Sequence, residues 1–220
     1  MTGQLFVFSA PSGAGKTSII NVLMERMESL AYSISHTTRP PRGGEKEGID
    51  YYFVGDSQFV DMISSGELVE WASVYGCRYG TSAVKLRDLT AAGTDVVLDV
   101  DNVGAFNIKR MFHDSVLIFI LPPSLEELER RLTARKTDTP GVIRGRMEKA
   151  ARVIAQCPRY DYLIVNDDLE EAVDRAESII KACRSKASRV APLLGNRFDL
   201  DFSGATLDGR GPDGGGGRDD

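Results

Sequence analysis

Four short runs of apolar residues divide the chain, and amphipathic segments separate them. The runs are LFVF (5–8), VVLDV (96–100), VLIFIL (116–121) and YLIV (162–165). Their apolarity is continuous rather than alternating, which is typical of strands that are covered on both faces of a parallel sheet. Between them, apolar residues recur every three or four positions and predict helices around 19–27, 125–132 and 169–180. Strands that alternate with such helices predict an α/β fold.

Two segments depart from this alternation. The stretch from 33 to 91 carries short strand-like sequences, YSIS (32–35) and YYFV (51–54), separated by glycine-rich turns, and we interpret it as a lobe inserted on the main sheet. The tail from 199 to 220 is rich in Gly and Asp and contains few hydrophobic residues. Because such a composition cannot bury enough apolar surface to order itself, we expect the tail to be disordered.

The composition limits the kinds of protein that this chain can be. It has 220 residues, 42% of them hydrophobic, which suits one globular domain. The formal net charge of -5 provides no basic field for nucleic acid or an anionic membrane. No segment approaches the roughly 18 apolar residues of a membrane span. Cys77, Cys157 and Cys183 are too scattered for a disulfide framework or a zinc site, so we expect a cytoplasmic protein.

The strongest chemical signal is APSGAGKT (10–17), between the first predicted strand and the first predicted helix. It matches the phosphate-loop pattern G-x-x-x-x-G-K-[ST] except at Ala10. Its glycines let backbone N–H groups face phosphate oxygens, Lys16 can reach the β- and γ-phosphates, and Thr17 can ligate Mg²⁺. A plain glycine turn is the alternative, which the order of strand, loop and helix disfavours. The predicted nucleotide-binding residues are Ala10, Pro11, Ser12, Gly13, Ala14, Gly15, Lys16 and Thr17.

A second candidate anion site follows in SHTTRPPRGGEKEGIDYYF (35–53). Arg39 and Arg42 flank two prolines, and a guanidinium fork suits bidentate phosphate binding. Tyr51 and Tyr79 could add phenolic donors. Without the phosphate loop, two solvated arginines on a loop would be the simpler interpretation. Beside a phosphate loop, a second anion site implies a phosphorylated acceptor, and hence phosphoryl transfer from one phosphate to another.

A series of segments in the chain resembles the guanylate kinase family and covers about residues 4–185. These segments are SAPSGAGKTS, SHTTRPPRGGE, GIDYYFV, ELVEWASVYG, YGTS, LDVD, LPPS and IVNDD. The resemblance implies phosphorylation of GMP and dGMP from ATP with Mg²⁺, in purine nucleotide metabolism. It also implies one domain with three parts. They are a P-loop NTPase core with a parallel sheet flanked by helices (1–32, 92–124 and 155–190), a GMP-binding lobe (33–91) and a small helical lid (125–154).

The resemblance implies the substrate contacts as well. Those expected at the GMP phosphate are Arg39, Arg42, Tyr51 and Tyr79, and those expected around the guanine are Ser35, Glu70, Thr81 and Asp101. Glu70 agrees with the chemistry, because one carboxylate can accept both the N1–H and the N2–H₂ of guanine, whereas adenine has an unprotonated N1. Taken alone, Glu70 beside Trp71 would be interpreted as a surface acid. Asn166, in IVNDD, is expected near the adenine of ATP.

Arginines are concentrated in LEELERRLTARKTDTPGVIRGRMEKA (125–150). Arg131 and Arg135 are four positions apart and would share a helix face. The resemblance implies that Arg131, Arg135 and Arg146 belong to a lid that closes over the phosphates and takes part in catalysis with Lys16. A solvated helix face on which Glu127 pairs with Arg131 is the alternative.

The segment LDVD (98–101) ends a predicted buried strand with two acids. Ligands of open α/β sheets gather at the carboxyl ends of strands, so these carboxylates are candidates for a role in the site. We expect Asp99 to take part in catalysis by orienting Mg²⁺ through its water shell, while Asp101 reaches the base. A charged strand end that faces solvent would give the same sequence.

Several positions depart from the family pattern. Asn102-Val103-Gly104 replaces x-Gln-Gly, and Ala134-Arg135-Lys136 replaces the Gly-Arg-Gly of the lid. Thr139-Pro140-Gly141 could shorten the helix that follows, and Arg78 stands where a tyrosine is common. Because none of these changes removes a phosphate ligand named above, we expect activity with altered kinetics.

Two alternative functions stay open from the sequence. One is a related kinase for another phosphorylated acceptor, such as ribose 1,5-bisphosphate, although Ser35 and Glu70 favour a base. The other is a non-catalytic module that resembles guanylate kinase and binds phosphopeptide or protein, although the intact Lys16 and Thr17 favour an enzyme. We expect small-molecule nucleotides as partners and a monomer or a small homo-oligomer.

Overall fold

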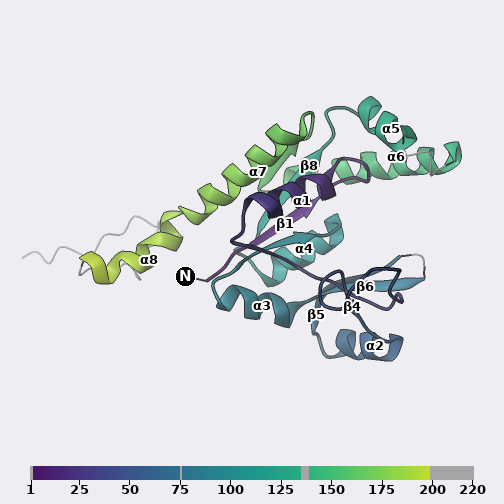
Figure 1. The fold of residues 1–220 in the computed structure, drawn as a ribbon. Coiled ribbons are helices and arrows are strands. Elements are labelled where there is room, and N and C mark those ends of the chain that lie inside the picture. The colour runs from purple at the N-terminus through teal and green to yellow at the C-terminus, as the bar shows by residue number, and fades with distance from the viewer. Residues whose placement is uncertain (1, 75, 135–138, 199–220) are drawn as a thin grey trace, which may run out of the picture. The chain divides into compact units, whose positions relative to one another are not determined.

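The computed structural model describes residues 2–74, 76–134 and 139–198 (Figure 1). The chain divides at Ile180 into two compact units: Thr2–Ile180 forms one, and the residues from Lys181 on belong to the other. The second unit holds the end of helix α7 (Leu169–Arg184) and helix α8 (Ala187–Phe198). The predicted disordered tail and Arg135 lie outside the described residues, and the other predicted site residues lie in the first unit.

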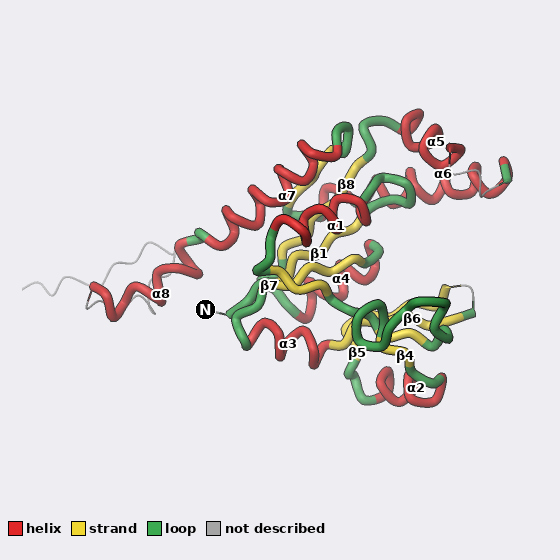
Figure 2. The backbone as a smooth tube through the Cα atoms, in the orientation of Figure 1, coloured by secondary structure: helices red, strands yellow, loops and turns green. Residues whose placement is uncertain are grey.

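The first unit is built on a five-stranded parallel sheet (Figure 2), which confirms the predicted α/β fold. In spatial order its strands are β2 (Leu30–Tyr32), β7 (Asp95–Asp99), β1 (Leu5–Ser9), β8 (Val116–Leu121) and β9 (Tyr162–Val165). All four apolar runs are therefore strands, and β1 is central. Because the strands are parallel, their carboxyl ends meet at one edge of the sheet, where ligands of such folds gather.

Both faces of this sheet are buried at its three inner strands, β7, β1 and β8, as the continuous apolarity predicts. The prediction is wrong for YLIV, because the edge strand β9 leaves Leu163 and Val165 48% and 41% exposed. Phe6 and Phe8 of β1 point to one face and Leu5 and Val7 to the other, and none is more than 3% exposed. In Figure 1, helices α1 (Lys16–Arg26) and α7 cover one face, and α3 (Ala83–Ala91) and α4 (Asn102–Met111) cover the other. The three predicted helices are confirmed as α1, α5 and α7.

The inserted lobe has its own four-stranded mixed sheet. In spatial order it consists of β4 (Tyr52–Phe53), β3 (His36–Thr37), β6 (Cys77–Ser82) and β5 (Leu68–Val74). Helix α2 (Asp56–Ser64) packs Phe59 and Met62 against Leu68 in a small separate core. The predicted strand YSIS (32–35) is wrong: Tyr32 ends a strand of the main sheet, His36 begins a strand of the lobe, and the chain crosses between the two sheets there.

Helices α5 (Leu125–Ala134) and α6 (Pro140–Ile154) form a hairpin with a small core of Leu128, Leu132 and Ala150, and a short 3₁₀ helix (Cys157–Arg159) leads to β9. Pro140 begins α6, where a missing N–H costs nothing, so it does not interrupt the helix. Among the residues that the structure describes, no helix combines the length and the apolarity that crossing a membrane requires.

Candidate nucleotide site

The phosphate loop connects β1 to α1 at the carboxyl edge of the main sheet. Gly13 and Gly15 adopt φ angles of 95° and 93°, a left-handed conformation that residues with a Cβ rarely adopt. Gly15 is the N-cap of α1, whose first turn contains no acidic residue. Within the loop, the Ala14 N–H donates to the Pro11 carbonyl at 3.2 Å, while Ser12 and Thr17 are exposed. The loop therefore presents a positive helix end next to exposed hydroxyls, as an anion site requires.

Lys16 is held in place at the carboxyl end of β7. Its ammonium group forms an ion pair with the Asp99 carboxylate, and it donates to the Val100 carbonyl at 2.9 Å. The Lys16 and Asp99 side chains are 17% and 21% exposed, so both remain accessible to a ligand. The structure thus brings together two predicted catalytic residues that are 83 positions apart in the sequence.

Asn166 lies against the phosphate loop. It follows β9, is 5% exposed, and donates from its side-chain amide to the Ala14 carbonyl at 2.7 Å. A Cβ at Gly15 would lie 2.1 Å from this amide nitrogen, so only glycine fits there. The resemblance placed Asn166 at the adenine and did not indicate this supporting contact, because Asn166 and Ala14 are 152 residues apart.

Two arginines of the α5–α6 hairpin reach the region of the loop. Arg131 donates from Nη2 to the Asn166 carbonyl at 3.1 Å, and Arg146 donates from Nη1 to the Ser12 hydroxyl at 3.4 Å. The pairing of Glu127 with Arg131, on which the alternative interpretation of this helix face rests, is also present, at 2.7 Å. Hydrogen bonds from Arg130 and Arg131 lower the pKa of Glu127 to about 2. Glu127 therefore stays ionised and holds the Arg131 guanidinium toward the loop.

Arg39 and Arg42, the two arginines expected at the GMP phosphate, are linked by one carboxylate, that of Glu45. Arg39 is 9% exposed and donates from Nη2 to Glu45 Oε1 at 2.7 Å, and the Arg42 backbone N–H donates to Glu45 Oε2 at 2.7 Å. Around Arg39, the Tyr51 ring centroid is 5.3 Å from Cζ, and the Tyr51 and Tyr79 rings are 5.9 Å apart. The structure thus gathers the four residues expected at the GMP phosphate, together with Glu45, which the sequence reasoning left without a role.

On the neighbouring strands β5 and β6, Glu70 and Thr81 form a polar pair. The Thr81 hydroxyl donates to Glu70 Oε1 at 2.5 Å. Burial raises the pKa of Glu70, and the nearby charge of Asp101 adds to this effect, while the Thr81 hydroxyl opposes it. A Cβ at Gly104 would lie 3.2 Å from Glu70 Oε2, so this glycine leaves room beside the carboxylate. Because Thr81 donates its hydroxyl proton to Glu70, the pair presents acceptor oxygens to the edge of a planar ligand.

The two remaining predicted base contacts have structural roles. Asp101 Oδ1 accepts the Gly104 N–H at 2.9 Å and caps α4, which begins at Asn102. Ser35 lies in the crossing between the sheets, where its carbonyl accepts the Tyr52 N–H at 2.9 Å. Val103, which stands where the family has glutamine, is 60% exposed. The altered sequence after Asp101 therefore leaves the helix and its cap intact.

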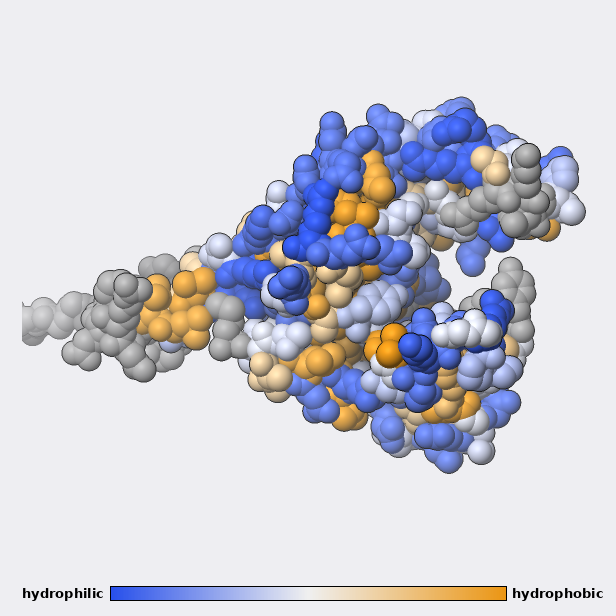
Figure 3. Space-filling view, in the orientation of Figure 1, coloured by the Kyte–Doolittle hydropathy of each residue, from blue (hydrophilic) through white to orange (hydrophobic). Residues whose placement is uncertain are grey.

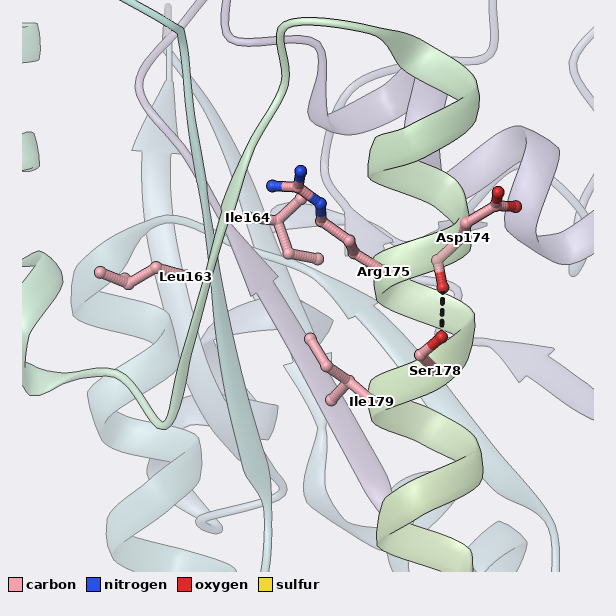
Figure 4. Close-up of a pocket in the computed structure, with 6 residues that line it drawn as sticks. All are labelled: Leu163, Ile164, Asp174, Arg175, Ser178 and Ile179. Atoms are coloured by element: carbon pink, nitrogen blue, oxygen red, sulfur yellow. Dashed lines mark hydrogen bonds between the residues drawn. The ribbon is translucent and has the colours of Figure 1, made fainter.

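Figure 3 shows a hollow in the surface between the α5–α6 hairpin and the lobe. A separate pocket lies against β9 and α7, where Leu163, Ile164 and Ile179 contribute apolar side chains (Figure 4). The Ser178 hydroxyl beside this pocket donates to the Asp174 carbonyl of its own helix at 2.7 Å. None of the predicted site residues lines the pocket, so it is no candidate for the nucleotide site.

The residues at the loop fit Mg²⁺ that is carried by a nucleotide. Thr17 offers an exposed hydroxyl, and Asp99 offers a carboxylate that is 21% exposed. Among the described residues, no group of three His, Cys, Asp or Glu side chains could hold a metal by itself. One hydroxyl and one carboxylate suit Mg²⁺, which binds proteins through few side chains and keeps phosphate and water ligands.

The parallel sheet, the glycine-rich loop at its carboxyl edge and the lysine at the start of α1 define a P-loop nucleotide-binding protein. The model of the guanylate kinase family matches residues 2–183. A guanylate kinase of Syntrophotalea carbinolica is 49% identical over 91% of this chain and 95% of the relative, and one of Polaromonas sp. is 48% identical over 84% and 90%. The crystal structure of guanylate kinase from Anaplasma phagocytophilum superposes with a TM-score of 0.70 at 39% identity and covers 91% of this chain and 97% of that one. This chain belongs to the guanylate kinase family.

Proposed function

We propose that the protein catalyses the ATP-dependent phosphorylation of GMP, and of dGMP, to the diphosphate. Membership of the guanylate kinase family supports this function. The observation that carries it is that the inserted lobe holds both a candidate phosphate site and a candidate site for the edge of a base. There, the Arg39–Glu45–Arg42 cluster can hold a phosphate, and the Glu70–Thr81 pair can accept the edge of a guanine. A nucleoside monophosphate presents these two parts on one molecule.

The reaction that fits this arrangement is direct in-line transfer. An oxygen of the acceptor phosphate forms a bond to the γ-phosphorus of ATP while the bond to the β-γ bridging oxygen breaks, so that ADP leaves. No nucleophilic side chain is required, because positioning and charge stabilisation supply most of the catalysis. Lys16, Arg131 and Arg146 spread the charge that develops, and we assign Arg135 to the same lid. Arg39 and Arg42 fix the acceptor phosphate, and Tyr51 and Tyr79 add phenolic donors.

We propose that Mg²⁺ is held by Thr17 and, through water, by Asp99. When bound, the ion neutralises charge on the ATP phosphates. Asp99 also keeps Lys16 extended along the loop through their ion pair. The proposed role of Asn166 is to keep the Ala14 carbonyl turned away from the phosphates, so that the loop N–H groups face the ligand. Contact of Asn166 with the adenine stays a prediction.

The alternative acceptor, a ribose bisphosphate, fits the lobe less well. It has no base edge to offer Glu70, whose partly buried carboxylate would then lack a donor from the ligand. A non-catalytic module would not need the ion-paired Lys16. The division into core, lobe and lid, the cytoplasmic location and the monomeric or small oligomeric state stay predictions.

The test is an acceptor profile. ADP formation from Mg-ATP is measured with GMP, dGMP, AMP, UMP, CMP and ribose 1,5-bisphosphate, each against a blank without acceptor. We expect turnover with GMP and dGMP alone. Turnover with AMP or with the sugar bisphosphate at a similar rate, or none with GMP despite measurable ATP binding, would overturn the proposed function.

A further inference from the structure

Glu45 lies between the two arginines expected at the acceptor phosphate and bonds to both. One carboxylate oxygen accepts from the Arg39 guanidinium, and the other accepts the Arg42 backbone N–H, each at 2.7 Å. These bonds from Arg39 and Arg42, together with the positive charges of the two arginines, lower the pKa of Glu45, so it is a carboxylate at neutral pH. Glu45 thus connects the side chain of one arginine to the backbone of the other.

The rest of the Arg39 side chain is fixed from other directions. Its second guanidinium nitrogen, Nη1, donates to the Pro40 carbonyl at 2.9 Å, and Tyr51 lies 5.3 Å from Cζ. Its backbone N–H donates to the Thr37 hydroxyl at 3.1 Å, and that hydroxyl donates to the Arg78 carbonyl at 3.0 Å. Because the side chain of Arg39 is only 10% exposed, it has little freedom to choose another rotamer. Glu45 supplies the ion pair of this guanidinium.

We propose that Glu45 is a positioning residue for the acceptor nucleotide, an inference that rests on the proposed function. Its carboxylate orients the Arg39 guanidinium and holds the turn that carries Arg42, so both cations face one phosphate before it binds. Ordering two arginine side chains only on binding would cost affinity, and Glu45 removes part of that cost.

Removing the Glu45 charge should weaken GMP binding, which is the opposite of what charge repulsion alone predicts. A carboxylate beside a phosphate site repels the phosphate, so removing its charge would tighten GMP binding if repulsion dominated. If orientation dominates, the same change weakens binding. Glu45→Gln separates the two, because it removes the charge and leaves one acceptor oxygen where two donors, from Arg39 and Arg42, need one each. The NH₂ of the glutamine side chain would then point at one of these two N–H donors.

The matched control is Asp50→Asn. Asp50 lies in the same connection between β3 and β4, and its carboxylate accepts a backbone N–H there, from Lys46 at 2.7 Å. A general loosening of this segment would affect both variants. An effect through the arginines would affect Glu45→Gln alone. Glu45→Asp, which keeps both oxygens and the charge, is the variant expected to recover part of the wild-type behaviour.

The experiment measures GMP binding by calorimetry without ATP or metal, and steady-state kinetics at saturating Mg-ATP. For Glu45→Gln we expect the Kd and the KM for GMP to rise about ten-fold, as the loss of a charge-assisted hydrogen bond does. We expect the KM for ATP to stay unchanged and kcat to fall less than about three-fold, with Glu45→Asp between Gln and the wild type. In an Arg39→Ala background, Glu45→Gln should add less than about three-fold, because coupled residues are not additive.

Each other outcome counts against the inference. Unchanged or tighter GMP binding by Glu45→Gln would show that repulsion dominates or that orientation is irrelevant. An equal effect of Asp50→Asn, or an equal rise in the KM for ATP, would assign the loss to the segment as a whole. Wild-type protein that neither binds nor phosphorylates GMP would overturn the proposed function and this inference together. If the wild-type protein phosphorylates GMP and Glu45→Gln changes neither the Kd nor the KM for GMP, the inference alone is overturned.

Discussion

The two ends of the site are built in different ways. At the phosphate loop, backbone carries the function: two glycines with positive φ, a helix N-terminus and a carbonyl fixed by the buried Asn166 amide. In the inserted lobe, side chains carry it, through ion pairs and hydrogen bonds among Arg39, Glu45, Glu70 and Thr81. The loop follows β1, the central strand of the main sheet, whose residues are all buried, whereas the core of the lobe centres on Phe59, Met62 and Leu68.

This difference indicates how each end tolerates change. A backbone site binds any phosphate chain, and it fails when sterics or packing change. A side-chain site can tell one base from another, and it fails when one charge or one donor is lost. The donor end should therefore be sensitive to the shape of small residues and, apart from Lys16, little dependent on side-chain charge, and the acceptor end should be sensitive to substitutions that keep size and alter charge.

The largest expected effect is that of Lys16→Ala, which removes the one cation within the loop. We expect kcat to fall about 10²- to 10³-fold, because the lost interaction is with charge that develops in the transition state. Steady-state kinetics with Mg-ATP and GMP measure it. Lys149→Ala, at an exposed position of α6, is the matched control and should leave kcat unchanged. A rise in KM with kcat unchanged would contradict the role of Lys16 in the transition state.

Arg39→Ala tests the separation between the two ends. We expect the KM for GMP to rise about 10- to 100-fold through the loss of charge-assisted bonds, while ATP affinity stays nearly unchanged. Kinetics with each nucleotide varied in turn, and Arg110→Ala on the exposed part of α4 as control, give the comparison. Equal losses for both nucleotides would show that the two ends are not independent.

Gly15→Ala tests the importance of shape at the donor end. A Cβ there meets the Asn166 amide nitrogen at 2.1 Å in addition to the unfavourable φ of 93°. We expect a stability loss of more than about 1–3 kcal/mol, the usual cost of the conformation alone, and weaker ATP binding. Gly66→Ala, with φ of 70° and nothing within 4 Å, isolates the conformational part. Equal losses of stability in the two variants, measured by chemical denaturation, would remove the contact with Asn166 from the explanation.

The smallest expected effect is a shift in the pH dependence of GMP binding. Because burial raises the pKa of Glu70, this carboxylate protonates at a higher pH than an ordinary glutamate. Protonation removes an acceptor for the guanine edge, so the KM for GMP should rise on acidification earlier than the KM for ATP. Glu70→Gln should flatten this rise while weakening GMP binding at neutral pH. A profile that Glu70→Gln leaves unchanged would assign the titration to another group.

The same pKa shift has a consequence for stability. A raised carboxylate pKa means that the folded protein binds a proton more tightly than the unfolded chain, so the ionised form costs stability as pH rises above the ordinary value. Near neutral pH, Glu70→Gln should therefore leave the Tm unchanged or raise it slightly. A clear fall in Tm would show that the hydrogen bond from Thr81 to the carboxylate stabilises the fold by more than burial of the carboxylate destabilises it.

The sequence predicted the main fold well and the lobe partly. Runs such as VLIFIL indicate parallel strands by composition alone, and all four runs are strands, but YLIV forms the edge strand β9 and is covered on one face only. The error at YSIS arose because Tyr32 and His36 belong to different sheets, a fact that depends on partners far away in the chain. YYFV correctly predicted β4 (Tyr52–Phe53), whereas β3, a strand of two residues, leaves no periodicity to detect.

The sequence by itself determined the chemistry of this protein: the lysine and glycines of the phosphate loop, the arginine pair and the acids that close the strands are local patterns. The tertiary structure decided how these groups are held. It placed the Asn166 amide on the Ala14 carbonyl, Asp99 on Lys16, and Arg131 and Arg146 of the α5–α6 hairpin beside the loop. These contacts join residues that are far apart in sequence, and their geometry follows from the strand order and the packing of the sheet, which no local pattern encodes.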